Sequence, residues 1–313
     1  MNDQIIFEDV SKFYGEVLGV NRVSLSIPPG ITTLVGPNGA GKTTIMNLMT
    51  GLIQPSSGHV SVLGLTPADA LEFFSAVGYC AQFDFFPRGI TGWQFILDSL
   101  MLHGMEKAMA ADLTVEALDR VQLGDAARRK IAGYSKGMRQ KIRLAQAIAH
   151  HPRVLVLDEP LNGLDPMARA ESIALFEELG RQGMHVIISS HILDEVDRIS
   201  DRVILITGGY LIAEGNIHQV RQEVHEKPMQ VLVRCDHPEL LASKMFSINH
   251  CVEARLHADG KGVFLRTSDI DEFYSKLNGI AADGLVKIDA VAPAADDANA
   301  IYQYLIGTDG SAS

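Results

Sequence analysis

The segment Gly36-Pro37-Asn38-Gly39-Ala40-Gly41-Lys42-Thr43 is the most informative part of this chain. It matches the pattern GxxxxGK[ST] at every fixed position, and it lies between the apolar run 31–35 and a predicted helix at 43–50. The glycines let successive backbone N–H groups point inward, and the helix N-terminus adds partial positive charge. A tight turn that only needs glycine would not explain Lys42 and Thr43 in register. The segment therefore predicts a phosphate-binding loop.

Each side chain of this loop has an expected role. Lys42 should contact the β- and γ-phosphates of a nucleotide, and Thr43 should give its hydroxyl to Mg²⁺. We therefore expect ATP and Mg²⁺ as cofactors. The residues predicted to contact the nucleotide here are Gly36, Pro37, Asn38, Gly39, Ala40, Gly41, Lys42, Thr43 and Thr44.

Two carboxylates follow a second apolar strand. Val154–Leu157 runs directly into Asp158 and Glu159. A buried central strand delivers its last residues to the carboxyl edge of the sheet, beside a phosphate loop. Asp158 can then hold Mg²⁺ directly or through water, and Glu159 can act as the general base for water attack. The alternative is a pair of solvated carboxylates at a strand end, which the upstream phosphate loop disfavours.

Composition limits the class of protein. The chain has 313 residues, enough for one large domain and a small one, with 47% hydrophobic and 21% charged residues. Its formal net charge of −11 argues against a nucleic-acid partner. Its three cysteines form no CxxC unit, which favours reduced thiols. The first residues show no signal peptide, and no apolar run approaches the ~20 residues of a membrane helix.

Alternating helices and apolar strands predict an α/β domain with a covered, mainly parallel sheet. We place this domain at residues 1–218. Its expected elements are strands at 5–10, 21–27 and 31–35, helix 43–50, a mostly helical region at 71–132 that contains strand 77–81, helix and strand within 137–157, helix 169–179, strand 185–189, and a hairpin at 203–207 and 211–214.

A polar helix at 217–224 and Glu226-Lys227-Pro228 mark a seam, after which the pattern changes. Residues 219–306 read as β-α-β-β-α-β with a last helix, the order of a small α+β ferredoxin-like domain. We expect 307–313 to be a flexible tail. The expected elements are strand 230–234, helix 238–245, strands 252–256 and 263–266, helix 270–277, strand 286–290 and helix 297–305.

Further motifs occur in a fixed order along the first domain: Gln82 after strand 77–81, Tyr134–Gln140 at the start of a helix, Leu161–Pro166 after the acidic pair, and Ser189-Ser190-His191 after a strand. Together with the phosphate loop, this set resembles the ATP-binding subunits of ABC transporters over residues 3–218. Its Tyr-Ser-Lys-Gly-Met signature and its tail domain are similar to the exporter-type subgroup linked to drugs, lipids or copper. The resemblance implies a phosphate-loop NTPase fold of ABC type, a mixed sheet with a helical subdomain.

The resemblance also implies roles for single residues. Tyr14 matches the aromatic residue that stacks on adenine; Phe13 is the second candidate, and a core aromatic is the structural alternative. Gln82 matches the residue that links the Mg²⁺ and water site to the membrane partner. His191 matches the switch residue that touches the γ-phosphate, so we expect it to act in catalysis with Glu159 and Lys42.

Three matched residues concern a second subunit. Ser135 and Gly137 match the signature that binds the γ-phosphate held by the opposite subunit, and Asp165 matches the loop that crosses the dimer interface. The signature departs from the commonest form, Leu-Ser-Gly-Gly-Gln, at Lys136 and Met138. Lys136 could lie near phosphate or face solvent, and we expect the second.

Two clusters invite a functional reading. Met101, Met105 and Met109 are spaced by four, which suggests one helical stripe; we favour helix packing or a docking face over a copper site. An aromatic cluster follows Gln82 and could be core, but we favour a groove that receives the membrane partner. Its members are Phe83, Phe85, Phe86, Trp93 and Phe95.

The resemblance implies an ATPase whose two subunits, expected to be identical, close on two ATP molecules and open after hydrolysis. A transmembrane permease subunit on a separate chain would be moved by this cycle, and export is favoured. The expected location is peripheral, on the cytoplasmic face of the cell membrane. The alternative is a soluble ABC-type ATPase that acts on nucleic acid or ribosomes, for which the fused second ATPase domain and the long coiled-coil insertion are not found.

Overall fold

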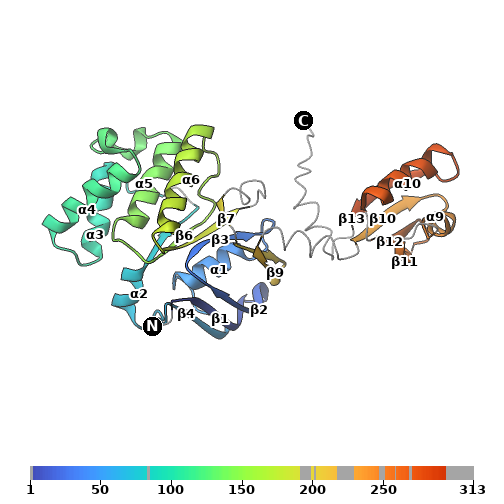
Figure 1. Ribbon diagram of the computed structural model, residues 1–313, viewed down its shortest axis with the longest axis horizontal. Helices are drawn as coiled ribbons and strands as arrows, with labels where there is room; N and C mark the ends of the chain where they lie inside the picture. The colour runs from blue at the N-terminus through green and yellow to red at the C-terminus, as the bar shows by residue number, and fades with distance from the viewer. Residues whose placement is uncertain are drawn as a thin grey trace. The chain divides into compact units, whose positions relative to one another are not determined.

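The chain forms two compact units, Met1–Gly215 and Asn216–Ser313 (Figure 1). We analysed a computed structural model that describes residues 3–82, 85–190, 199–200, 202–216, 229–246, 251–257, 259–267 and 270–293. Within these residues, no helix has the length and apolar character needed to span a membrane.

A mainly parallel sheet forms the centre of the first unit. Among the described residues its six strands lie in the order β5-β6-β7-β3-β8-β9, and the pairs among the first five are parallel. All residues of β6 and β7 are buried, which confirms the predicted covered sheet. The strands are β3 (Gly30–Val35), β5 (Val77–Cys80), β6 (Val154–Leu157), β7 (His185–Ser190), β8 (Arg202–Thr207) and β9 (Tyr210–Asn216).

A second, antiparallel sheet has the order β2-β1-β4, with β1 (Ile5–Tyr14), β2 (Val17–Ile27) and β4 (Ser57–Val62). Helix α1 (Lys42–Met49) shares one apolar cluster with both sheets. Strand β4 was not predicted. Its first three residues are polar or glycine and exposed, and only its second half alternates buried apolar residues, so its sequence carries little strand signal.

Helices α3, α4 and α5 pack together in a helical subdomain, whose core is continuous with one face of the central sheet (Figure 1). Figure 1 shows them grouped away from the antiparallel sheet. The other helices of this unit whose bounds the structure describes are α2 and α6, besides two short 3-10 turns. The bounds are α2 (Ala70–Ala76), α3 (Gly92–Leu102), α4 (Lys107–Arg120), the 3-10 turns Gly124–Ala126 and Ile131–Gly133, α5 (Lys136–Ile148) and α6 (Pro166–Arg181).

The methionine stripe predicted for one helix is wrong. Helix α3 ends at Leu102, Gly104 has a φ of 83°, and α4 starts at Lys107. Met101, Met105 and Met109 therefore lie on α3, on the connecting turn and on α4. The chain leaves the helix through a left-handed conformation at Gly104, which glycine adopts readily and other residues adopt only at a cost.

The aromatic cluster after Gln82 does not form one exposed groove. Phe86, Trp93 and Phe95 are partly buried and pack against the helical core, and the Phe86 and Phe95 rings meet edge to face at 5.2 Å. Phe85 is 86% exposed, and Phe83 lies outside the described residues. Most of the cluster thus belongs to the core, and the prediction of a groove built from all five was wrong.

In the second unit, the described elements follow the predicted β-α-β-β-α-β order. The sheet order is β11-β12-β10-β13 with antiparallel pairs, and Gly260 provides the turn before β12 with a φ of 67°. The predicted helices 217–224 and 297–305 and the tail 307–313 lie outside the described residues. The elements are β10 (Met229–Cys235), α9 (Pro238–Met245), β11 (Cys251–Leu256), β12 (Gly262–Thr267), α10 (Ile270–Ala282) and β13 (Ile288–Pro293).

Candidate functional site

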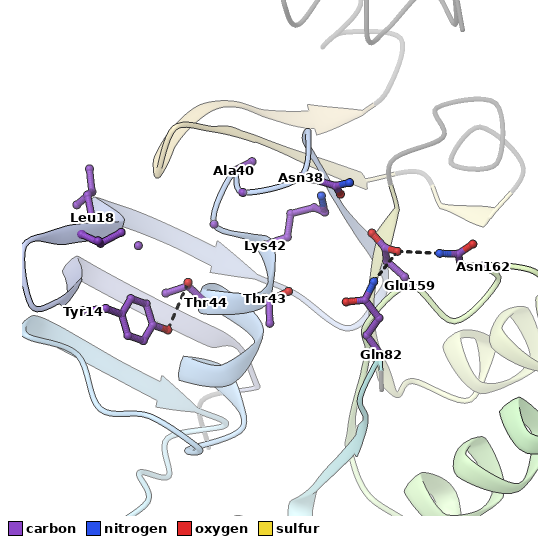
Figure 2. A pocket seen from close by; sticks show the side chains of 14 residues that line it. Tyr14, Leu18, Asn38, Ala40, Lys42, Thr43, Thr44, Gln82, Glu159 and Asn162 are labelled. Atoms are coloured by element: carbon purple, nitrogen blue, oxygen red, sulfur yellow. Dashed lines mark hydrogen bonds between the residues drawn. The ribbon is translucent and has the colours of Figure 1, made fainter. Parts of the chain in front are cut away.

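A cleft of about 560 Å³ opens where the phosphate loop meets the ends of the parallel strands (Figure 2). The loop supplies one wall, the turn between β1 and β2 supplies another, and Gln82, Glu159 and Asn162 close the third side. Of the predicted loop residues, 38–44 line the cleft directly, whereas Gly36 and Pro37 lie behind it and hold Lys42.

The loop geometry depends on glycine. Gly41 has a φ of 108°, and a Cβ there would lie 2.8 Å from the carbonyl oxygen of Gly19. Lys42 follows as the first residue of α1, with Nζ donating to the carbonyl oxygens of Gly36 at 2.5 Å and Pro37 at 3.1 Å. Burial lowers the pKa of Lys42, and the carboxylates of Glu159 and Asp158 oppose this effect. The ammonium group is thus held beside the cleft, where it can donate hydrogen bonds to phosphate oxygens in place of these carbonyl oxygens.

Asp158 is placed beside the phosphate loop by the sheet. Its side chain is buried, and its Oδ2 accepts a hydrogen bond from Thr43 Oγ1 at 3.0 Å. A carboxylate and a hydroxyl oxygen that converge in this way are hard ligands that suit Mg²⁺. Among the described residues, no group of three His, Cys, Asp or Glu side chains is close enough to hold a metal.

Glu159 lies at the cleft in a rare backbone conformation, with a φ of 48°. Its Oε2 accepts hydrogen bonds from Gln82 Nε2 at 3.0 Å and from Asn162 Nδ2 at 3.2 Å (Figure 2). Two amide groups from separate loops therefore orient one carboxylate. Gln82, which was predicted as a metal ligand, contacts the predicted base Glu159 in this structure. Asn162 was not predicted as a site residue, although its place three residues after Glu159 is typical of a short turn.

Tyr14 lies in the cleft at the end of β1, 45% exposed, with its hydroxyl 3.5 Å from Thr44 Oγ1 (Figure 2). Phe13 is equally exposed, but it is not among the residues that line the cleft. Val17 and Leu18 add apolar surface beside the tyrosine and were missed by the sequence analysis. A flat ring beside apolar side chains can stack on a nucleotide base.

The residues predicted to meet a second subunit, Ser135, Gly137 and Asp165, do not line this cleft. Ser135 is the N-cap residue of α5 and accepts a hydrogen bond from the Met138 N–H at 3.2 Å, and Asp165 caps α6 by accepting from the Met167 N–H at 3.1 Å. The described lining of the cleft includes neither of them, nor Gly137. His191 lies outside the described residues.

Comparison with known proteins places this geometry in a family. Residues 20–162 match the family model described as ABC transporter. The chain is 34% identical over 217 residues to the uncharacterised ABC transporter ATP-binding protein YxlF of Bacillus subtilis (strain 168), which covers 69% of this chain and 72% of that protein. The chain belongs to the ABC transporter family. This ABC protein therefore carries the ATPase cassette that its motifs predicted.

Two further matches extend the comparison. This ABC subunit is 31% identical over 278 residues to the Nod factor export ATP-binding protein I of Rhizobium etli, covering 87% of this chain and 85% of that protein. Because 278 residues exceed the length of the first unit, the match reaches into the second. A solved structure of the ATP-binding subunit of an ABC transporter superposes with a TM-score of 0.65 at 25% identity, covering 70% of this chain and 92% of that one.

Proposed function

We propose that this protein hydrolyses ATP to drive export through a separate transmembrane permease subunit. The observation that carries the proposal is the convergence of Lys42, the Thr43–Asp158 pair and the oriented Glu159 carboxylate on one cleft. Export is favoured by the similarity to the Nod factor export protein, which extends over both units. The rival, a soluble ABC-type ATPase, lacks such a supporting relative among these matches.

The residues divide the chemistry among them. Lys42 and the N–H groups of the loop bind the phosphates, and Tyr14 stacks on the base. Thr43 and Asp158 hold Mg²⁺, which neutralises charge that develops on the phosphates. Glu159 takes a proton from the attacking water, and the amides of Gln82 and Asn162 keep its carboxylate turned toward the cleft. We keep His191 as a predicted γ-phosphate contact.

A second copy completes the site. The N-terminus of α5, with Ser135 and Gly137, is a suitable anion site but is absent from the described lining of its own cleft. We infer that this terminus binds the γ-phosphate held by a second subunit, with Asp165 at the interface. ADP lacks the γ-phosphate, so hydrolysis would release the pair. Residues 219–306 are then an accessory domain for dimerisation or regulation.

Sedimentation of Glu159→Gln protein tests this arrangement. We expect a dimer with ATP and a monomer with ADP, because the variant binds ATP but cannot activate water. The control is Glu159→Gln/Ser135→Arg, in which a guanidinium blocks the start of α5 and the protein should stay monomeric with ATP. A monomer of Glu159→Gln with ATP would contradict the shared site, and an absence of turnover in the wild type would contradict the hydrolytic role.

An apolar groove offers the docking site for the permease. A cavity of about 720 Å³ lies between α2 and the end of α3, and it is lined by Leu71, Phe74, Leu102 and Met105 among others. Leu71 and Leu102 are 82% and 89% exposed. Such a surface suits an amphipathic helix. Helix α2 leads directly into β5 and then Gln82, so movement of the occupant would reach the Glu159 carboxylate.

Membrane association tests the groove. Leu71→Ser/Leu102→Ser should lose co-sedimentation with membrane vesicles that contain the permease, because polar side chains remove the apolar contact. Met109→Ser, a change at an exposed apolar residue (57%) that does not line the groove, is the control. Equal retention of both variants on the vesicles would contradict the assignment.

A further inference from the structure

Ser189 is a buried serine that the function above does not use. It lies near the end of β7, between β6, which carries the acidic pair, and β3, which leads into the phosphate loop. The register pairs Ile188 with Leu157 on β6 and Ser189 with Leu34 on β3. Ser189 is therefore level with Asp158, at the carboxyl edge of the sheet, and only 1% of its surface is exposed.

The hydroxyl of Ser189 makes two short hydrogen bonds to neighbouring catalytic residues. Its Oγ donates to Asp158 Oδ1 at 2.7 Å and accepts from the backbone N–H of Glu159 at 2.7 Å. A hydroxyl has one proton to donate, and here the carboxylate receives it. A lone pair of the same Ser189 oxygen accepts the hydrogen bond from the Glu159 N–H. One side chain thus links the predicted metal ligand to the predicted base.

The bond to Asp158 selects which carboxylate oxygen serves the cation. Oδ1 is held by Ser189, while Oδ2 accepts from Thr43 Oγ1 at 3.0 Å. With Oδ1 held, the carboxylate cannot turn freely, and Oδ2 stays beside the Thr43 hydroxyl. The two oxygens expected to meet Mg²⁺ are thereby kept together before the ion binds.

The bond to Glu159 supports an unfavourable backbone. Glu159 has a φ of 48°, in the left-handed region that residues other than glycine seldom adopt. In this backbone conformation, the Glu159 carboxylate accepts the hydrogen bonds from Gln82 and Asn162. The Glu159 N–H group donates to Ser189, so loss of the hydroxyl would remove this hydrogen bond and favour relaxation of the peptide.

We propose that Ser189 is a positioning residue for ATP hydrolysis, whose hydroxyl sets the Asp158 carboxylate toward Mg²⁺ and the Glu159 backbone toward the cleft. It touches no substrate and acts through its two neighbours. The proposal rests on the hydrolytic function proposed above. It makes a specific claim: the hydroxyl matters for Mg²⁺ and for turnover, but not for binding of metal-free ATP, which depends on Lys42 and the loop.

The test compares Ser189→Thr with Ser189→Val, two side chains of nearly equal shape that differ in the hydroxyl. Three quantities are measured: kcat, the affinity for a fluorescent ATP analogue in EDTA, and the gain in that affinity on adding Mg²⁺. Loss of a group that orients a metal ligand typically costs about 10- to 100-fold in metal affinity or activity. We expect losses of this size in kcat and in the Mg²⁺-dependent gain for Ser189→Val, unchanged affinity in EDTA, and substantial recovery in Ser189→Thr.

The control is Ser172→Ala, which removes another buried serine hydroxyl, one that bonds to the Ala168 carbonyl on α6 at 2.8 Å. It should leave all three quantities unchanged. Equal behaviour of Ser189→Val and Ser189→Thr, or an equal loss of affinity in EDTA and in Mg²⁺, would overturn the proposal. Because the Mg²⁺-dependent gain is a binding measurement, it tests Ser189 even if the wild type fails to turn over.

Discussion

Asn162→Ala should slow ATP hydrolysis without weakening ATP binding. The Asn162 amide is one of two donors to Glu159 Oε2, at 3.2 Å, and the Gln82 amide is the other, at 3.0 Å. Removal of Asn162 leaves the carboxylate with one of these two donors, so it spends less time turned toward the water site. Lys42 and the loop are unchanged, so the nucleotide should bind as before.

The size of the effect follows from the contact. A hydrogen bond to a charged group contributes about 1.5–3 kcal/mol, and Asn162 is exposed, which places it near the lower limit. About 1.5 kcal/mol corresponds to a roughly tenfold loss of kcat, because each 1.36 kcal/mol is a factor of ten. Steady-state ATPase assays would give kcat, and a fluorescent analogue would give the affinity. We expect a tenfold lower kcat with affinity within a factor of two.

Asn162→Asp sharpens the test because it keeps the shape and replaces the donor with a second carboxylate. Repulsion between the two carboxylates should turn Glu159 away, so the loss should exceed that of Asn162→Ala. If Asn162→Asp were as active as the wild type, the claim that this amide orients the base would be wrong. A parallel loss of ATP affinity in Asn162→Ala would also contradict it, since the residue would then be a nucleotide ligand.

Three further outcomes are expected. Gly41→Ala should lower the free energy of unfolding by about 2–3 kcal/mol in urea, because of its positive φ and the 2.8 Å approach to Gly19, whereas Gly133→Ala, with open space, should not. Tyr14→Ala should weaken ATP-analogue binding about tenfold through lost stacking, and Phe13→Ala should leave it unchanged. Burial lowers the pKa of His150 to about 4. Between about pH 6.5 and pH 4, His150 therefore binds a proton in the unfolded chain but not in the folded chain. Stability should therefore fall by about 2 kcal/mol between pH 7 and pH 5, and His150→Gln should reduce this loss when urea unfolding is compared at the two pH values.

The parts of the fold that were predicted are those whose signal is local. The glycine spacing at 36–41 predicts a loop between a strand and a helix, and the apolar run Val154–Leu157 predicts a buried strand. Each prediction needs only a few neighbouring residues, and the structure has the expected elements at both places. Strand β4 was not predicted, because half of it is polar and because its pairing partner β1 lies about fifty residues earlier in the chain. The break between α3 and α4 was marked by Gly104, which was read as part of a continuous helix.

The choice between Phe13 and Tyr14 shows a second limit. Adjacent strand residues point to opposite faces, so either ring could have faced the cleft. Strand β1 contains irregularities in register between Val10 and Phe13, which shift this alternation. Only the folded strand shows that Tyr14 lines the cleft and Phe13 does not.

The amino-acid order alone was enough to predict the chemical groups of the site: a phosphate loop, a carboxylate for a metal and a carboxylate for a base. It did not show that Gln82 and Ser189 contact the Asp158–Glu159 pair, because these contacts join segments that are far apart along the chain. The contact of Asn162 with Glu159 is local, but it depends on the turn that follows β6. Ser189 lies 31 residues from Asp158 along the chain. The two are neighbours because the packing of the whole sheet sets the register of β6 against β7, and no local pattern encodes a register between parallel strands.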